Sequence, residues 1–220
     1  MNALLKIMLS LALFFASTFL LLKSTGIITI EKIETWLVLA RSTDIKYVMV
    51  IVIGLLFADL FVAVPTLTVM ILGGFFLGAN LGAAVAICGL LLAGSCGYVV
   101  SHRYGYLLLN QLVKEPIKRR QAVDMFQQHG AILILLSRAM PILPEVSACM
   151  AGLTKMPFPK FITLWLLNSV PYAVIASYAG SISSIDNPLP AILTAIGLTA
   201  ISWFGWLIFN RSRKSVIRRY

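Results

Sequence analysis

The stretch "LLSRAMPILPEVSACMAGL", Leu135–Leu153, is mostly apolar, yet it contains an arginine, two prolines and a glutamate. A charge inside a membrane segment is costly, and a proline removes a backbone hydrogen bond from a helix. A regular spanning helix would exclude both. The stretch therefore predicts a broken helix that dips into the membrane, because irregular backbone is tolerated there only inside protein or beside a cavity.

The whole chain has the composition of an integral membrane protein. Of its 220 residues, 60% are hydrophobic and 12% are charged, whereas about a quarter of the residues in soluble domains are charged. The apolar runs are long and do not alternate, which indicates helices and not a β-barrel. The basic residues behind the net charge of +10 lie beside these runs, where they set topology and contact anionic lipid headgroups. This placement argues against nucleic acid as a partner.

The order of the apolar runs predicts an all-α membrane protein with three regions. Residues 1–44 are expected to form a retained N-terminal helix, Ile7–Leu22, and an interfacial segment. Residues 45–183 form the core. Residues 184–220 contain a last spanning helix, Ala191–Phe209, and a basic tail.

The core contains two broken apolar blocks, 47–77 and 131–156, each followed by an expected spanning run, Gly78–Val100 and Phe161–Ala179. If both blocks are re-entrant hairpins, the N-terminus, the polar stretch His102–Gly130 and the basic tail share one side of the membrane. That side then collects most of the lysines and arginines, and the positive-inside rule makes it cytoplasmic. Two full crossings would put the basic middle loop outside, so the re-entrant arrangement fits better.

The two broken blocks align with each other at a shift of 79 positions. This shift pairs Pro65 with Pro144, Gly73 with Gly152, and Asp59 with Arg138. In the topology above the first block enters from outside and the second from the cytoplasm, so the repeats are inverted. Inverted repeats with broken helices are typical of transporters, whose site lies near the bilayer midplane where the repeats meet.

Three charged residues within these blocks are the candidate site: Asp59, Arg138 and Glu145. Arginine presents a planar fork of donors that binds phosphate or carboxylate, and a desolvated carboxylate can exchange protons. Prolines and glycines beside them can free backbone groups or allow a ligand to approach closely: Pro65, Pro141, Pro144, Gly73, Gly74 and Gly152. Two plainer interpretations stay open, namely a buried ion pair that only fixes the fold and glycines that serve helix packing alone.

Other side chains give weaker signals. No carboxylate or cysteine cluster accompanies His102 and His129, so no metal or other cofactor is expected. No nucleophile and base occur at a known catalytic spacing, so the chain is not expected to be an enzyme. The tryptophans, including Trp165, are interpreted as anchors at the membrane interface.

The sequence resembles a known membrane family. The stretches "SRAMPILPEVSACMAGLTKMPFPKF" and "NSVPYAVIASYAGS" are similar to the second half of DedA-like proteins, also called VTT-domain or SNARE-associated Golgi proteins. "ILGGFFLGANLGAAVAICGLLLAGSCGYVVSHRYG" resembles the first half. The resemblance covers about Ile45 to Ser183. In the first hairpin, "VPTLTV" stands where the family has a P-x-P-G-E pattern.

The resemblance implies two opposed re-entrant hairpins and a role in lipid transport. Bacterial members are linked to recycling of undecaprenyl phosphate or flipping of phospholipid, and eukaryotic relatives to lipid scrambling. The resemblance also implies that the protein lies in a bacterial inner membrane and that transport is coupled to protons through acidic residues in the hairpins. Arg138 matches the arginine of the second hairpin, and Asp59 lies where many bacterial members have a glutamate.

Translocation of a lipid phosphate such as a polyprenyl phosphate or a phospholipid is therefore the leading hypothesis. The alternatives are a proton-coupled transporter of a small ion or solute, and a membrane assembly protein without transport activity. The sequence alone does not indicate an oligomeric state.

Overall fold

The computed structural model describes residues 13, 44–61, 64–112, 115–139, 143–184 and 187–217. This part of the chain consists of helices and their connections, and it contains no strand. The expected N-terminal helix, Ile7–Leu22, lies outside the described residues apart from Leu13. Pro141 also lies outside them.

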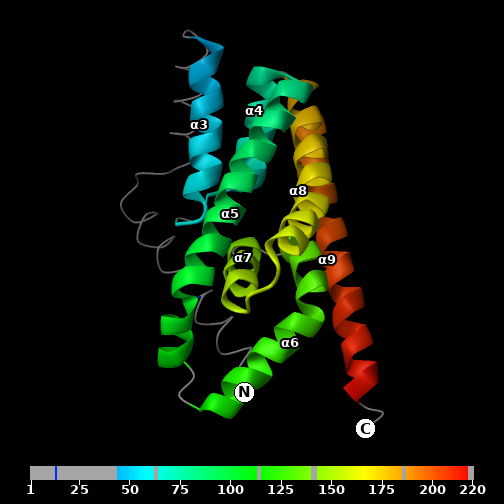
Figure 1. Ribbon diagram of the computed structural model, residues 1–220. Helices are drawn as coiled ribbons and strands as arrows, with labels where there is room; N and C mark the ends of the chain where they lie inside the picture. The colour runs from blue at the N-terminus through cyan, green and yellow to red at the C-terminus, as the bar shows by residue number, and fades with distance from the viewer. Residues whose placement is uncertain are drawn as a thin grey trace.

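The first broken block consists of two short helices, α3 (Ile45–Ala58) and α4 (Thr66–Leu77). The Asp44 side chain accepts a hydrogen bond from the backbone N–H of Lys46 at the start of α3, which is the usual way to cap a helix start. Pro65 precedes α4, where its missing N–H costs little because a first-turn donor has no helical partner. The two helices pack against each other. In Figure 1 α3 descends from the top of the molecule to mid-height, and α4 returns to the top.

Gly78 connects the first block to the long helix α5 (Ala79–Leu112). Its φ of 80° lies in the left-handed region, which glycine adopts without steric cost, and this turn reverses the chain from α4 into α5. The sequence predicted a spanning run from Gly78 to Val100 and then a polar surface stretch. The helix continues without a break to Leu112, into the polar stretch, and its apolar segment, Ala79–Gly105, includes the predicted run except Gly78.

The second broken block consists of α6 (Pro116–Leu135), the short 3-10 helix η1 (Ser137–Ala139) and α7 (Leu143–Leu153). Its first helix begins with Pro116 in its first turn and passes through the polar stretch, whereas the sequence placed the start of the block near residue 131. In Figure 1 α6 rises from the bottom of the molecule, and α7 lies at its centre.

Two further long helices follow, α8 (Phe158–Ser181) and α9 (Leu189–Ile217). The segments Ala79–Gly105 and Phe158–Ser181 are long and apolar enough to cross a membrane, and α9 contains the shorter apolar part Leu189–Gly205. These three helices contain the three spanning runs that the sequence predicted after the first broken block.

The second helix of each block packs mainly on the long helix that follows the other block. α4 lies along α8, α7 lies along α5, and α5 and α8 contact each other between them. The apolar core correspondingly divides into two clusters. One surrounds α3 and α4 and includes Val52, Leu56 and Met70. The other surrounds α7 and includes Phe126 and Met150.

Candidate functional site

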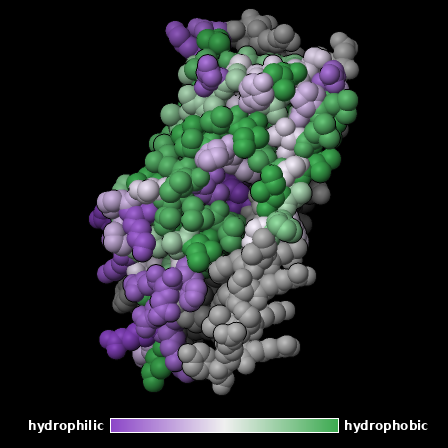
Figure 2. All heavy atoms as spheres, turned by 90° about the vertical axis from the view of Figure 1, so that its right-hand side faces the viewer, coloured by the Kyte–Doolittle hydropathy of each residue, from purple (hydrophilic) through white to green (hydrophobic). Residues whose placement is uncertain are grey.

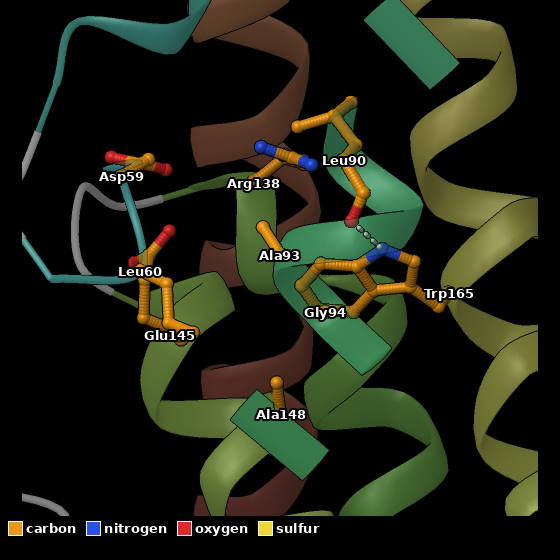
Figure 3. Close-up of a pocket in the computed structure, with 9 residues that line it drawn as sticks. All are labelled: Asp59, Leu60, Leu90, Ala93, Gly94, Arg138, Glu145, Ala148 and Trp165. Atoms are coloured by element: carbon orange, nitrogen blue, oxygen red, sulfur yellow. Dashed lines mark hydrogen bonds between the residues drawn. The ribbon is translucent and has the colours of Figure 1, made fainter. Parts of the chain in front are cut away.

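The three charged residues of the two broken blocks line one small internal pocket (Figure 3). Its volume is about 10 Å³, which is room for roughly one water molecule. Asp59 follows α3, Arg138 lies in η1 and Glu145 lies in the first turn of α7. The pocket therefore lies where the interruptions of the two blocks meet. Its walls are formed by Asp59, Leu60, Leu90, Ala93, Gly94, Arg138, Glu145, Ala148 and Trp165.

Asp59 has a structural contact as well as a charge. Its side chain is 7% exposed, and its Oδ1 atom accepts a hydrogen bond of 2.9 Å from the backbone N–H of Val64. This bond closes the turn between α3 and α4. Because the same carboxyl group also faces the pocket, removing its charge and removing its hydrogen bond are two separable changes.

Replacing Asp59 should separate these two roles. Asp59→Asn keeps an oxygen that can accept from Val64, so we expect its thermal stability to lie near that of wild type while activity falls. Asp59→Ala leaves the buried Val64 N–H without a partner, which costs about 1–3 kcal/mol. Thermal unfolding of both purified variants measures the difference. Equal stability of Asp59→Asn and Asp59→Ala would contradict a structural role for the hydrogen bond.

Arg138 is held by contacts that leave part of its guanidinium group without a partner. Its Nη2 atom donates to Ser169 Oγ over 3.2 Å. The guanidinium carbon lies 5.8 Å from the ring centroid of Trp165 and 5.5 Å from that of Tyr172, which are favourable cation–π distances. Its Nε atom is buried without a hydrogen-bond partner. A buried N–H without a partner is unfavourable, so this edge of the arginine is suited to an incoming acceptor.

One face of α8 holds Arg138 and the chain around it. Trp165, Asn168, Ser169 and Tyr172 are spaced by three or four positions, so they share that face. The Asn168 side chain donates to Ile134 O and to Ser137 Oγ, each over 2.9 Å. It thereby satisfies a carbonyl near the end of α6, immediately before η1.

Trp165 corrects a sequence-based prediction. It was interpreted as an anchor at the membrane interface, but it is 3% exposed and its indole N–H donates to Leu90 O on α5 over 3.0 Å. The interface interpretation is wrong for this residue. The spacing of Trp165, Asn168, Ser169 and Tyr172 was the signal in the sequence, but a single sequence does not reveal which face of an apolar helix points inward.

The charged groups of the pocket lie near one another without forming a direct ion pair. Asp59 interacts electrostatically with Glu145 and with Arg138. Figure 3 shows the two carboxyl groups on one side of the pocket, with Arg138 between them and Trp165. The salt bridge between Lys46 and Asp44, at 3.7 Å, lies on the surface and not at the pocket. Arg138 is therefore not neutralised by a contact with either carboxylate.

Arg138 also reaches a second, larger space. A groove of about 390 Å³ runs between the end of α6, α8 and α9. Its walls are almost entirely apolar, and its polar side chains are those of Arg138, Asn168 and Tyr172. Figure 2 shows this side of the molecule, with a small hydrophilic spot recessed within the apolar surface of its middle part and a larger hydrophilic region at the lower left. Arg138 therefore lies between the small internal pocket that contains Asp59 and Glu145, called the acidic pocket below, and this groove on the side of the helix bundle.

The other predicted site residues that the structure describes do not line the pocket or the groove. Pro65 precedes α4, and Pro144 is buried in α7. Gly74 lies against α8, where a Cβ atom would be 2.0 Å from Ser177 O, and Gly152 lies against α5, where it would be 2.2 Å from Tyr98 O. Helix packing explains both glycines, because only glycine allows such close backbone contact.

Gly73 differs from its neighbour Gly74. A Cβ atom at Gly73 would meet only the Val52 side chain, at an ordinary 3.5 Å. Contact of these prolines and glycines with a ligand stays a prediction.

Comparison with known proteins gives the family. The VTT domain model matches residues 64–182, which include the acidic pocket except for Asp59 and Leu60. The chain is 23% identical over 207 residues to undecaprenyl phosphate transporter A of Bacillus subtilis, covering 86% of this chain and 98% of that protein. It is 30% identical over 156 residues to an uncharacterized membrane protein of Synechocystis, covering 65% of this chain and 69% of that protein.

No solved structure gives a significant match. The family match extends over more than half of the chain, and the relatives are membrane proteins by name. The matched region includes α5, η1, α7 and α8, which carry all of the pocket residues except Asp59 and Leu60. The chain is therefore a helical membrane protein that belongs to the VTT-domain family, also known as the DedA family.

Proposed function

We propose that this protein moves a lipid phosphate between the two leaflets of a membrane, with Arg138 binding the phosphate group. One observation carries the proposal: Arg138 lies between an apolar groove on the side of the bundle and an internal acidic pocket. A lipid phosphate needs an apolar surface for its chain and a cation for its headgroup. The name of the Bacillus subtilis relative supports undecaprenyl phosphate, a polyprenyl phosphate, as the substrate class.

The surroundings of Arg138 favour an oxyanion. Its Nε atom has no partner and one of its Nη atoms has a single neutral acceptor, Ser169. Arginine binds phosphate with two parallel N–H···O bonds, which are stronger than bonds between neutral groups. The rings of Trp165 and Tyr172 lie near its guanidinium group and restrict its rotation.

We also propose that the protein contains a pair of inverted re-entrant hairpins, one formed by α3 with α4 and the other by α6 with α7. The exchange of packing partners supports it, since α4 lies on α8 and α7 on α5. Two close contacts between helix backbones support it too. Gly74 meets Ser177 and Gly152 meets Tyr98, and Tyr98 and Ser177 are 79 positions apart, the shift that aligns the two blocks.

We propose that the carboxyl groups of Asp59 and Glu145 couple phosphate binding to the uptake and release of protons. Both lie at the pocket that Arg138 borders, so they compete electrostatically with a bound phosphate. We propose that protonation of this pair favours phosphate binding and that deprotonation favours release. We further propose that both termini lie on the cytoplasmic side of a bacterial inner membrane, an orientation that the distribution of basic residues supports.

Reconstitution of the purified protein in sealed liposomes tests this function against transport of a small ion. Half of a fluorescent polyprenyl phosphate should be accessible to an impermeant quencher in empty liposomes, and nearly all of it when the protein is present. Inorganic phosphate trapped in the same liposomes should stay inside. Release of trapped phosphate together with an unchanged lipid distribution would favour a solute transporter and overturn the proposal.

A further inference from the structure

The polar side chains of the groove beside Arg138 differ in how far the protein already uses their donors. Besides Arg138, they are Asn168 and Tyr172. The Asn168 amide donates to Ile134 O and to Ser137 Oγ, so it is engaged by the chain that leads into η1. The Nε atom of Arg138, in contrast, is buried without a partner. The hydroxyl group of Tyr172 is the remaining polar group of these walls.

Tyr172 differs from the other tyrosines whose side chains the structure describes. Three of them are more than half exposed, namely Tyr47, Tyr104 and Tyr178. Tyr98 is buried, and its hydroxyl donates to Met156 O. Tyr172 is only partly exposed, and its hydroxyl makes no hydrogen bond with any residue that the structure describes. A tyrosine hydroxyl in apolar surroundings usually has a partner, so this one is a donor that lacks an acceptor.

Of the two aromatic rings near Arg138, the ring of Tyr172 is the one that carries a free donor. The indole N–H of Trp165 donates to Leu90 O, as Figure 3 shows. The guanidinium carbon of Arg138 lies 5.5 Å from the centroid of the Tyr172 ring, so a group bound to the guanidinium lies beside this ring. Arginine and tyrosine can therefore contact one ligand from two elements, η1 and α8.

Arginine alone does not distinguish between the anionic headgroups of a membrane. Its planar fork forms two parallel N–H···O bonds with a phosphate or with a carboxylate. The phosphate group of a lipid monoester has a third terminal oxygen, whereas a carboxylate has only the two that the fork occupies. A further donor beside the fork therefore favours phosphate, because only phosphate has an oxygen left to accept from it.

We propose that Tyr172 is a specificity-determining residue, whose hydroxyl donates to the third oxygen of a phosphate held by Arg138 and so selects lipid phosphates over lipid carboxylates. This inference rests on the proposed function and adds a discrimination that Arg138 does not supply. A fatty-acid carboxylate on Arg138 would leave the tyrosine hydroxyl without an acceptor in an apolar groove, which is unfavourable.

Tyr172→Phe tests the hydroxyl alone, because it keeps the ring beside Arg138. Tyr178→Phe is the matched control, since Tyr178 lies on the same helix, is 57% exposed and borders neither the groove nor the acidic pocket. Binding to the purified proteins in nanodiscs is measured against empty nanodiscs. The two probes are hexadecyl phosphate and hexadecanoate, whose chains have the same length and whose headgroups differ.

Wild type should bind hexadecyl phosphate at least about tenfold more tightly than hexadecanoate. Tyr172→Phe should weaken binding of hexadecyl phosphate about tenfold, the usual effect of losing one hydrogen bond to a charged group, and should change binding of hexadecanoate by less than about twofold. Tyr178→Phe should leave binding of both probes within about twofold of wild type. Because the Tyr172 hydroxyl has no partner among the described residues, Tyr172→Phe should keep the thermal unfolding midpoint of wild type.

Two results would overturn the inference: equal binding of the two probes by wild type, or a Tyr172→Phe variant that weakens binding of neither probe or of both to the same extent. A parallel loss for both probes would mean that the tyrosine only holds Arg138 in place. In these cases binding of lipid phosphate that depends on Arg138 would persist, so the proposed function would survive. If Arg138→Ala left binding of hexadecyl phosphate unchanged, the proposed function itself would fail.

Discussion

Arg138→Lys should slow transport of a lipid phosphate about 10- to 100-fold, although the positive charge is kept. Lysine cannot form two parallel bonds with one phosphate, and it lacks the N–H that corresponds to the unpaired Nε of arginine. Loss of one charge-assisted hydrogen bond costs about 1.5–3 kcal/mol, and each 1.4 kcal/mol corresponds to about a factor of ten. The initial rate of lipid translocation in proteoliposomes measures the effect.

Arg103→Lys is the matched control for this substitution. Arg103 is an exposed arginine on α5 that borders neither the acidic pocket nor the groove. Its substitution should leave the transport rate within about twofold of wild type. If Arg138→Lys transported as fast as Arg103→Lys, then Arg138 would supply only a general positive charge and a phosphate fork would be excluded.

Gly74→Ala should destabilise the protein by about 3 kcal/mol, at the upper end of the cost of overpacking. The new Cβ atom would lie 2.0 Å from Ser177 O, 2.5 Å from Ser177 Cα and 2.6 Å from Ser177 C, all of which belong to the backbone of α8. A backbone cannot rotate away as a side chain can, so α4 and α8 would have to separate. Because this contact joins the first block to the helix after the second, transport should fall as well.

Gly73→Ala is the control, one residue away in the same helix. Both changes raise helix propensity by the same amount, but at Gly73 the nearest atoms are Val52 methyl groups at 3.5 and 3.6 Å. We expect its stability to stay within about 1 kcal/mol of wild type. Thermal unfolding in detergent compares the two variants. A similar midpoint for Gly73→Ala and Gly74→Ala would contradict the close packing of α4 on α8.

The interruptions of the helices could be predicted from the sequence because their causes are local. Asp59 and Pro65 flank the turn between α3 and α4, and Arg138 lies in the interruption between α6 and α7. A charge in an apolar run and a proline each oppose a regular membrane helix wherever they occur. The two charged residues, Asp59 and Arg138, therefore marked both the broken blocks and the candidate pocket.

The contacts between helices could not be predicted in the same way. The shift of 79 positions pairs Gly73 with Gly152, but Gly74 makes the corresponding backbone contact. A rotation of one residue about the helix axis decides this, and the two adjacent glycines, Gly73 and Gly74, leave it open in the sequence. Trp165 was misplaced for a similar reason, since its hydrogen bond to Leu90 joins residues 75 positions apart. The groove also depends on how α9 packs against α8.

We propose that Arg138 binds a lipid phosphate as it crosses the membrane, and a comparison of two lipids with and without this arginine tests that role. Wild type and Arg138→Ala are reconstituted side by side with a fluorescent polyprenyl phosphate and with the matching uncharged polyprenol. The phosphate should equilibrate between leaflets in wild-type liposomes and stay near the rate of empty liposomes with Arg138→Ala, while the polyprenol should move equally in both. If wild type and Arg138→Ala moved the phosphate equally, or if wild type did not move it, then Arg138 would not bind a lipid phosphate for transport.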